Sequence, residues 1–235
     1  MATTMTYSQP AARASEAARA EFIRRTYTHL ALAILGFILV ENLLLQSSFA
    51  PALVQTMVAG YGWFAVLAAF MGVSWLADRW AQSNASPQMQ YLGLGLYIVA
   101  EAVIFLPMLY IATSYSSPDV IPTAGLMTLL LFGGLTFTAF TTRKDFSFLR
   151  GVLSIGGFVA LGVILASMLF GFSLGLFFSA IMVTFAAGSI LYTTSNIIHH
   201  YRPDQHVAAS LALFAGVALM FWYLVQILLA LGGDD

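Results

Sequence analysis

The sequence predicts an all-α integral membrane protein with seven transmembrane helices. Of its 235 residues, 60% are hydrophobic and 8% are charged, whereas about 25% of the residues in a soluble domain are charged. Seven apolar stretches each have the length needed to cross a hydrocarbon core of about 30 Å. Their apolar residues show no alternating ten-residue pattern, which argues against a β-barrel. Lipid is therefore the expected solvent.

Turn-forming residues set the limits of the seven predicted spans. We expect them at residues 28–46, 57–77, 90–112, 121–141, 148–170, 173–195 and 206–231. Because only Phe170–Ser173 separates the fifth span from the sixth, these two should form a tight hairpin.

The segments outside the membrane domain of residues 28–231 are short. Residues 1–27 are expected to be a cytoplasmic tail with an interfacial helix, which Ser15 can cap. Residues 232–235 are expected to be a short tail on the non-cytoplasmic side of the membrane.

The basic residues indicate the orientation. All nine precede the first span, fall in the second, fourth and sixth links, or lie at the edge of one of these links, as Arg150 does: Arg13, Arg19, Arg24, Arg25, Arg79, Arg143, Lys144, Arg150 and Arg202. The positive-inside rule then places the N-terminus in the cytoplasm and Asp234–Asp235 outside.

Composition also excludes several kinds of site. The chain has no cysteine, which excludes disulfides, thiolate catalysis and Cys-ligated metals. A net charge of -1 argues against a nucleic-acid partner, which would require a basic patch. We expect no metal site and no cofactor.

Two carboxylates fall inside predicted spans. Glu101 lies about 16 Å into the third span, near the midplane, and Glu41 lies in the outer half of the first. No Lys or Arg lies in the interior of a span to pair with them. Intramembrane carboxylates commonly serve proton or cation sites, which is the interpretation favoured for Glu101. For Glu41 we favour a neutral carboxyl that hydrogen-bonds across a helix interface or reaches the membrane surface.

Pro107 follows Glu101 by six residues. It should remove one backbone hydrogen bond and kink the helix, which would make it a gate or cavity wall. The equally weighted alternative is that it only shapes packing.

The sixth span ends in three hydroxyl residues, Thr193, Thr194 and Ser195. The seventh carries Ala208, Ala212 and Gly216 on one helical face, a spacing that favours close packing between helices. The glycine pairs Gly133–Gly134 and Gly156–Gly157 are expected to be close-packing sites as well. His199, His200 and His206 are expected to be solvated residues of the turn between these two spans.

Two stretches resemble the Bax inhibitor-1 family. Ala139–Leu149 (AFTTRKDFSFL) is similar to the family's basic loop between spans four and five, and Ile190–His199 (ILYTTSNIIH) to the end of its penultimate span. Weaker similarities at Phe22–Tyr27 and Ala100–Glu101 extend the resemblance over nearly the whole chain. The short tails are typical of bacterial members, which would place the chain in the inner (plasma) membrane.

The resemblance implies six helices packed around a central C-terminal seventh. It also implies a calcium leak, suppression of cell death or stress, or modulation of a membrane-anchored AAA protease. The family's pH sensor is a pair of aspartates, and the matching positions here are Thr193 and Gly216, which cannot ionise. The resemblance therefore predicts altered or lost pH gating.

Two functions are predicted, and neither is enzymatic. In the first, the chain conducts calcium or another cation slowly, with Glu101, Thr193, Thr194, Ser195 and Gly216 as pore or proton-responsive candidates. In the second, it conducts nothing and uses its cytoplasmic basic loop to modulate a membrane-bound protease or a stress or cell-death partner. That loop contains Arg143, Lys144 and Asp145.

Overall fold

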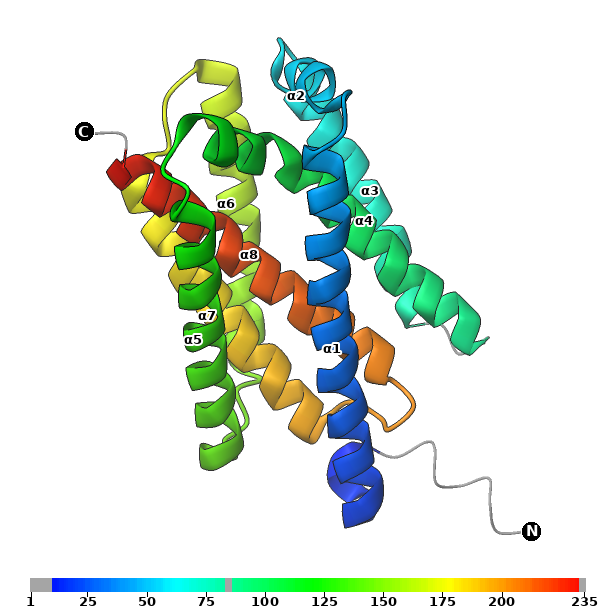
Figure 1. Ribbon diagram of the computed structural model, residues 1–235. Helices are drawn as coiled ribbons and strands as arrows, with labels where there is room; N and C mark the ends of the chain where they lie inside the picture. The colour runs from blue at the N-terminus through cyan, green and yellow to red at the C-terminus, as the bar shows by residue number, and fades with distance from the viewer. Residues whose placement is uncertain (1–9, 83–85, 233–235) are drawn as a thin grey trace. The chain divides into compact units, whose positions relative to one another are not determined.

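A computed structural model describes residues 10–82 and 86–232, and within these the chain is helical with no strands (Figure 1). The elements are η2 (Ala11–Arg13), α1 (Glu16–Leu45), α2 (Ala50–Val58), α3 (Gly62–Ala81), α4 (Pro87–Tyr115), α5 (Val120–Thr142), α6 (Leu149–Phe170), α7 (Gly175–His199) and α8 (His206–Gly232). The all-α prediction is confirmed. Residues 1–9 of the predicted tail, residues 83–85 of the second link and Asp234–Asp235 lie outside the described residues.

The chain divides into two compact units. Unit 1 comprises the chain up to Tyr115 together with Arg202–Phe214, and unit 2 comprises Ser116–Tyr201 and the chain from Ala215 onward. Helix α8 contributes its first part to unit 1 and the rest to unit 2. Among the helices that are long and apolar enough to cross a membrane, α4 and α8 have the largest fraction of residues buried within the protein. The arrangement of six helices around the seventh stays a prediction.

The predicted spans correspond to these helices with one exception. Within the described residues, six helices are long and apolar enough to cross a membrane, and the bent pair of α2 and α3 makes up to seven. Helix α1 begins at Glu16, where the Ser15 hydroxyl accepts a hydrogen bond from the Ala18 amide. The predicted cap is confirmed, but the helix that it starts runs unbroken to Leu45 instead of ending near Tyr27.

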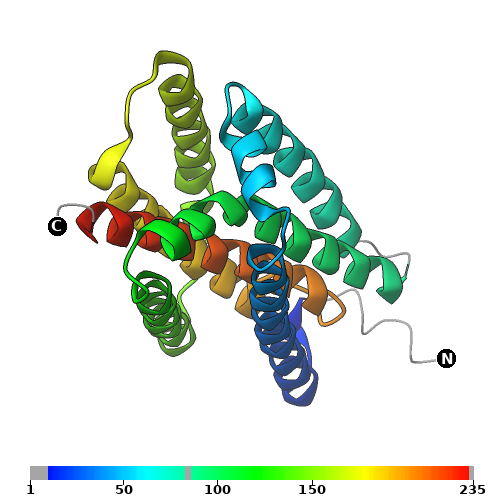
Figure 2. The same cartoon turned by 45° about the horizontal axis from the view of Figure 1, so that its top comes forward.

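The span predicted over residues 57–77 corresponds mainly to α3, but its first residues belong to α2. Helix α2 ends at Val58, and α3 starts at Gly62 after a bend of 98°. Gly60 has a φ of +52°, and a Cβ at Gly62 would lie 2.4 Å from the Thr56 carbonyl oxygen. Only glycine tolerates these two positions readily. Figure 2 shows α2 crossing from the end of α1 to the start of α3.

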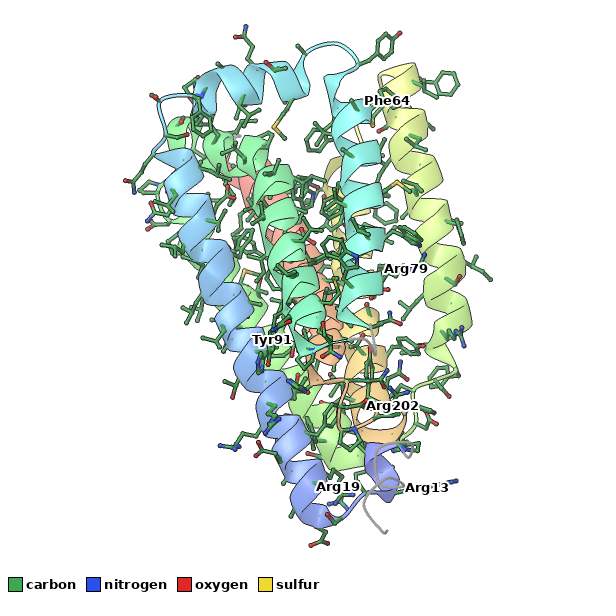
Figure 3. The ribbon with its side chains drawn as sticks, turned by 90° about the vertical axis from the view of Figure 1, so that its right-hand side faces the viewer. Arg13, Arg19, Phe64, Arg79, Tyr91 and Arg202 are labelled. Carbon is green, nitrogen blue, oxygen red and sulfur yellow. The ribbon has the colours of Figure 1, made fainter. Side chains whose placement is uncertain are left out.

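In unit 1, α4 packs against both α1 and α3. The helices α3 and α4 approach closely at Gly93, where a Cβ would lie 2.5 Å from the Ala77 carbonyl oxygen. Arg13, Arg19 and Arg202 gather at the end of this unit opposite Phe64 (Figure 3). We call this end the arginine end.

In unit 2, α7 packs against α5 and α6. The predicted close packing at Gly156–Gly157 is confirmed, because a Cβ at Gly156 would lie 3.0 Å from the Phe185 ring. The same prediction for Gly133–Gly134 is wrong, since a Cβ there would meet open space. The predicted hairpin of α6 and α7 is confirmed, with Gly171 (φ +73°) ending α6 and Gly175 starting α7.

Candidate functional site

Helix α4 buries Glu101 in unit 1. Tyr97, Glu101 and Phe105 are four residues apart and therefore share one helical face, and all three are buried. The Tyr97 hydroxyl donates a hydrogen bond to the Glu101 carboxylate. Pro107 lies within the helix and is also buried, and its missing N–H leaves the Val103 carbonyl without its usual helical donor. The carboxylate is thus held by its own helix.

Four aromatic rings form an arc on the same side of α4. The ring centroids of Tyr97 and Phe214 are 6.0 Å apart, and those of Phe214 and Phe37 are 6.1 Å apart. The chain of contacts closes at Phe105, whose ring centroid is 5.1 Å from that of Phe37. Because Tyr97 and Phe105 lie one turn before and one turn after Glu101, the arc begins and ends beside the carboxylate.

Glu41 is the second buried carboxylate, and its environment differs from the expected one. Its side chain is 4% exposed, and neither carboxylate oxygen has a hydrogen-bond partner among the residues described. The prediction that Glu41 hydrogen-bonds across a helix interface is therefore wrong, and the alternative that it reaches the membrane surface stays a prediction. Helix α1 points it inward because Phe37 and Glu41 are one turn apart on the buried face.

A cluster that the sequence did not predict lies toward the arginine end of unit 1. The Tyr91 hydroxyl lies 3.2 Å from His29 Nε2 and 3.4 Å from His206 Nε2, and Figure 3 shows Tyr91 beside α1. His29 Nδ1 lies 2.7 Å from the Arg25 carbonyl oxygen. His206 is therefore not the solvated turn residue that we expected. His29 and Tyr91 are 62 positions apart, and no local pattern links them.

In unit 2, the three adjacent hydroxyl residues near the end of α7 have different environments. Ser195 Oγ accepts a hydrogen bond from the Phe146 amide at 2.9 Å and lies 3.4 Å from the Lys144 carbonyl oxygen. It thereby ties the loop after α5 to the end of α7. Thr193 is buried, and Thr194 is fully buried with no hydrogen-bond partner for its hydroxyl in the described part of the chain.

Gly216 is a close-packing position of α8, as its spacing predicts. A Cβ there would lie 3.0 Å from Ile190 Cγ1 on α7. Ile190 precedes Thr194 by one helical turn, so Gly216 packs near the hydroxyl residues at the end of α7.

The basic loop between α5 and α6 has a defined conformation. Arg143 and Lys144 are exposed, and Arg143 ends α5 with a φ of +50°. The Asp145 carboxylate accepts a hydrogen bond from the Ser147 amide at 2.9 Å and lies 3.8 Å from His200 Nε2. The hydrogen bond from the Ser147 amide lowers the pKa of the Asp145 carboxyl.

The candidate residues thus fall into two groups. Glu101 and Pro107 belong to unit 1, whereas Thr193, Thr194, Ser195 and Gly216 belong to unit 2. Their convergence on one pathway stays a prediction. Across residues 10–82 and 86–232, no three His, Asp or Glu side chains form a group able to hold a metal ion.

Comparison with known proteins gives consistent matches. Residues 19–233 match the family described as inhibitor of apoptosis-promoting Bax1. An uncharacterized protein of Pseudomonas aeruginosa is 33% identical over 215 residues, which cover 91% of this chain and 90% of that protein. Bax inhibitor 1 of Schizosaccharomyces pombe is 28% identical over 96% of this chain and 82% of its own length.

Two relatives from Escherichia coli have names that state a role or a location. The modulator of FtsH protease YccA from strain K12 is 29% identical over 204 residues, covering 86% of this chain and 90% of that protein. The relative from strain O6:H1 matches to the same extent and is named an inner membrane protein.

Proposed function

Because the chain belongs to the Bax inhibitor-1 family, we propose that this multi-pass membrane protein provides a slow leak for cations, calcium foremost. The observation that carries the proposal is Glu101, a carboxylate that is 5% exposed and bonded only through Tyr97 of its own helix in the interactions described. Enclosing a carboxylate in a membrane helix is costly, and such residues commonly mark ion or proton pathways.

The surroundings of Glu101 support a slow pathway. A conduit needs polar groups that replace part of an ion's hydration shell without holding the ion tightly. Glu101 supplies one such group, and its aromatic surroundings restrict water. We further propose that the hydroxyls of Thr193 and Thr194 line the same pathway, that Pro107 shapes its wall, and that the N-terminus is cytoplasmic.

The leak is tested in proteoliposomes that contain a calcium dye. We expect wild-type protein to admit calcium faster than protein-free vesicles do, and Glu101→Gln to slow the entry. Because Thr193 and Gly216 cannot ionise, flux should change only gradually around neutral pH. Entry equal to that of protein-free vesicles at every pH would refute the proposal. A steep step that survives Glu101→Gln would place the sensor elsewhere.

A second candidate function is modulation of a membrane-bound protease without any flux. It is favoured by the exposed Arg143 and Lys144, which Ser195 holds in a fixed loop, and by the resemblance to the E. coli protease modulator. Crosslinking in native membranes should recover a protease with wild-type protein and less of it with the double variant Arg143→Gln/Lys144→Gln. Equal recovery would argue against this use of the loop.

A further inference from the structure

One hydroxyl group joins three helices of unit 1. It belongs to Tyr91 on α4, and its two partners are His29 on α1 and His206 at the start of α8. The Tyr91 oxygen lies 3.2 Å from His29 Nε2 and 3.4 Å from His206 Nε2, and the two imidazole centroids are 5.0 Å apart. Because a hydroxyl has a single hydrogen, it donates to only one of the two rings.

The partners fix the direction of each hydrogen bond when both rings are neutral. His29 Nδ1 lies 2.7 Å from the Arg25 carbonyl oxygen, and since a carbonyl only accepts, this nitrogen carries the hydrogen of the ring. His29 Nε2 therefore accepts from the Tyr91 hydroxyl. The Tyr91 hydrogen is then used, so His206 Nε2 must donate to the Tyr91 oxygen. His206 Nδ1 is left as the bare nitrogen of that ring.

The two rings differ in their capacity for a further proton. His206 Nδ1 is buried without a hydrogen-bond partner in the described residues, so a proton there would create a buried N–H with no acceptor, which is costly. His29 Nε2 faces the Tyr91 oxygen, whose two lone pairs accept from both rings at once. Tyr91 is 44% exposed, so its own hydrogen can turn to water. A proton on His29 is therefore fully hydrogen-bonded.

The charges around the cluster are already engaged. Besides His29, the groups that act electrostatically on His206 are Arg25, Glu21 and Asp204. The charged residues of the elements packed here pair or contact within their own element: Arg24 and Arg25 with Glu21, Arg202 with Asp204, Asp78 with Gln82, and Arg79 with the Trp75 ring. Among these groups no carboxylate is left over to offset two imidazolium charges side by side, and like charges disfavour each other.

We propose that His29, Tyr91 and His206 form a proton-binding site that takes up a single proton from water, on His29 Nε2, while His206 stays neutral. On binding, the bond between Tyr91 and His29 reverses direction, and the hydroxyl hydrogen turns to water. Both rings then donate to the Tyr91 oxygen, so each helix keeps its bond. The bond between α1 and α4 becomes charge-assisted and hence stronger. This site goes beyond the proposed leak and does not depend on it.

Nitrogen NMR of the histidine-labelled protein in lipid reports which ring nitrogens carry hydrogen. Single His→Gln variants assign the four histidines. From pH 8 to pH 5, the range in which an imidazole ordinarily changes charge, we expect His29 to become doubly protonated. His206 should keep its Nε2 hydrogen and its bare Nδ1 throughout. Uptake by His206, by both rings or by neither ring in this range would overturn the proposal.

Proton counting tests the same assignment independently. Between pH 8 and pH 5, His29→Gln should take up about one proton fewer than the wild-type protein. His206→Gln keeps an N–H donor for the Tyr91 oxygen and should take up as many protons as the wild-type protein. Thermal unfolding in detergent checks that both variants fold. A proton lost in His206→Gln, or none lost in His29→Gln, would contradict the site.

A third variant tests the shared oxygen. Tyr91→Phe removes the acceptor of the charged ring, and a charge-assisted hydrogen bond is about twice as strong as a neutral one. The midpoint of the His29 NMR titration should therefore move to lower pH by about one unit. Tyr115→Phe on the same helix changes a ring that is 78% exposed and should leave the midpoint in place. An unmoved midpoint in Tyr91→Phe would overturn the role of the hydroxyl.

Discussion

Unit 1 buries side chains that can change charge, whereas unit 2 buries only hydroxyls among its described polar residues. The buried polar residues of unit 1 include Glu41 and Glu101. Those of unit 2 are Thr128, Ser167, Ser179, Thr193, Thr194 and Ser195. Most of these hydroxyls bond to a carbonyl of the preceding helical turn or to the loop that they hold. The comparison indicates that the buried groups able to change charge lie in unit 1. The buried hydroxyls of unit 2 mainly hold the backbone in fixed positions.

The difference bears on the family's acidic pair. The resemblance implies aspartates at the positions of Thr193 and Gly216, both in unit 2. Here Gly216 is a close-packing position against Ile190, and an aspartate there would need the two helices to separate. At Gly216, α7 and α8 therefore pack closely where the resemblance implies a charge.

The largest expected effect concerns packing. Gly93→Ala should cost about 3 kcal/mol or abolish folding, because its Cβ would lie 2.5 Å from the Ala77 carbonyl oxygen and 2.7 Å from the Ala81 nitrogen. Gly95→Ala on the same helix has open space and should be neutral or slightly stabilising. Thermal unfolding in detergent measures both. Equal midpoints would show that α3 and α4 can move apart.

The next effect tests where titration lies. Thr128→Val removes a buried hydroxyl of unit 2 that bonds to the Ala124 carbonyl and keeps nearly the same shape, so it should change calcium flux less than about twofold, whereas Glu101→Gln should reduce it about tenfold. The readout is dye-reported entry into proteoliposomes. A larger loss in Thr128→Val than in Glu101→Gln would reverse the comparison between the units.

A smaller effect is expected at the loop that Ser195 holds. Ser195→Ala removes the acceptor of the Phe146 amide and should destabilise the loop by about 1 kcal/mol. Trypsin should then cut faster after Arg143 or Lys144. Thr184→Ala removes a hydroxyl that bonds only to the Ala180 carbonyl in the described contacts, and serves as the control. Unchanged cleavage in Ser195→Ala would mean that another contact holds the loop.

The smallest effect is the pH dependence of that loop. Because hydrogen bonding lowers the pKa of Asp145, its contribution is fully present above the ordinary carboxyl pKa of 3.8 and is lost as the pH falls through the lowered value. Hydrogen exchange of the Ser147 amide should therefore become less protected only in acid. Asp145→Asn should abolish this pH dependence, and an unchanged profile would assign it to another group.

Local properties of the sequence predicted most of the fold. Apolar length located the spans, Ser15 marked the start of α1, and Gly156 marked a close packing. The bend between α2 and α3 was missed because the apolar run continues through Gly60, and hydropathy carries no information on backbone direction. The burial of Glu41 and the contacts of His29, Phe37 and Phe214 were missed because they join residues on different helices, far apart in sequence.

The unbroken course of α1 has a mechanical consequence. Its 30 residues span about 45 Å, roughly 15 Å more than a hydrocarbon core. The turns bearing Arg19, Arg24 and Arg25 are therefore continuous with the turns bearing Phe37 and Glu41. A helix transmits displacement along its axis as a stiff rod, so a load applied to the basic turns reaches the aromatic rings without a joint to absorb it.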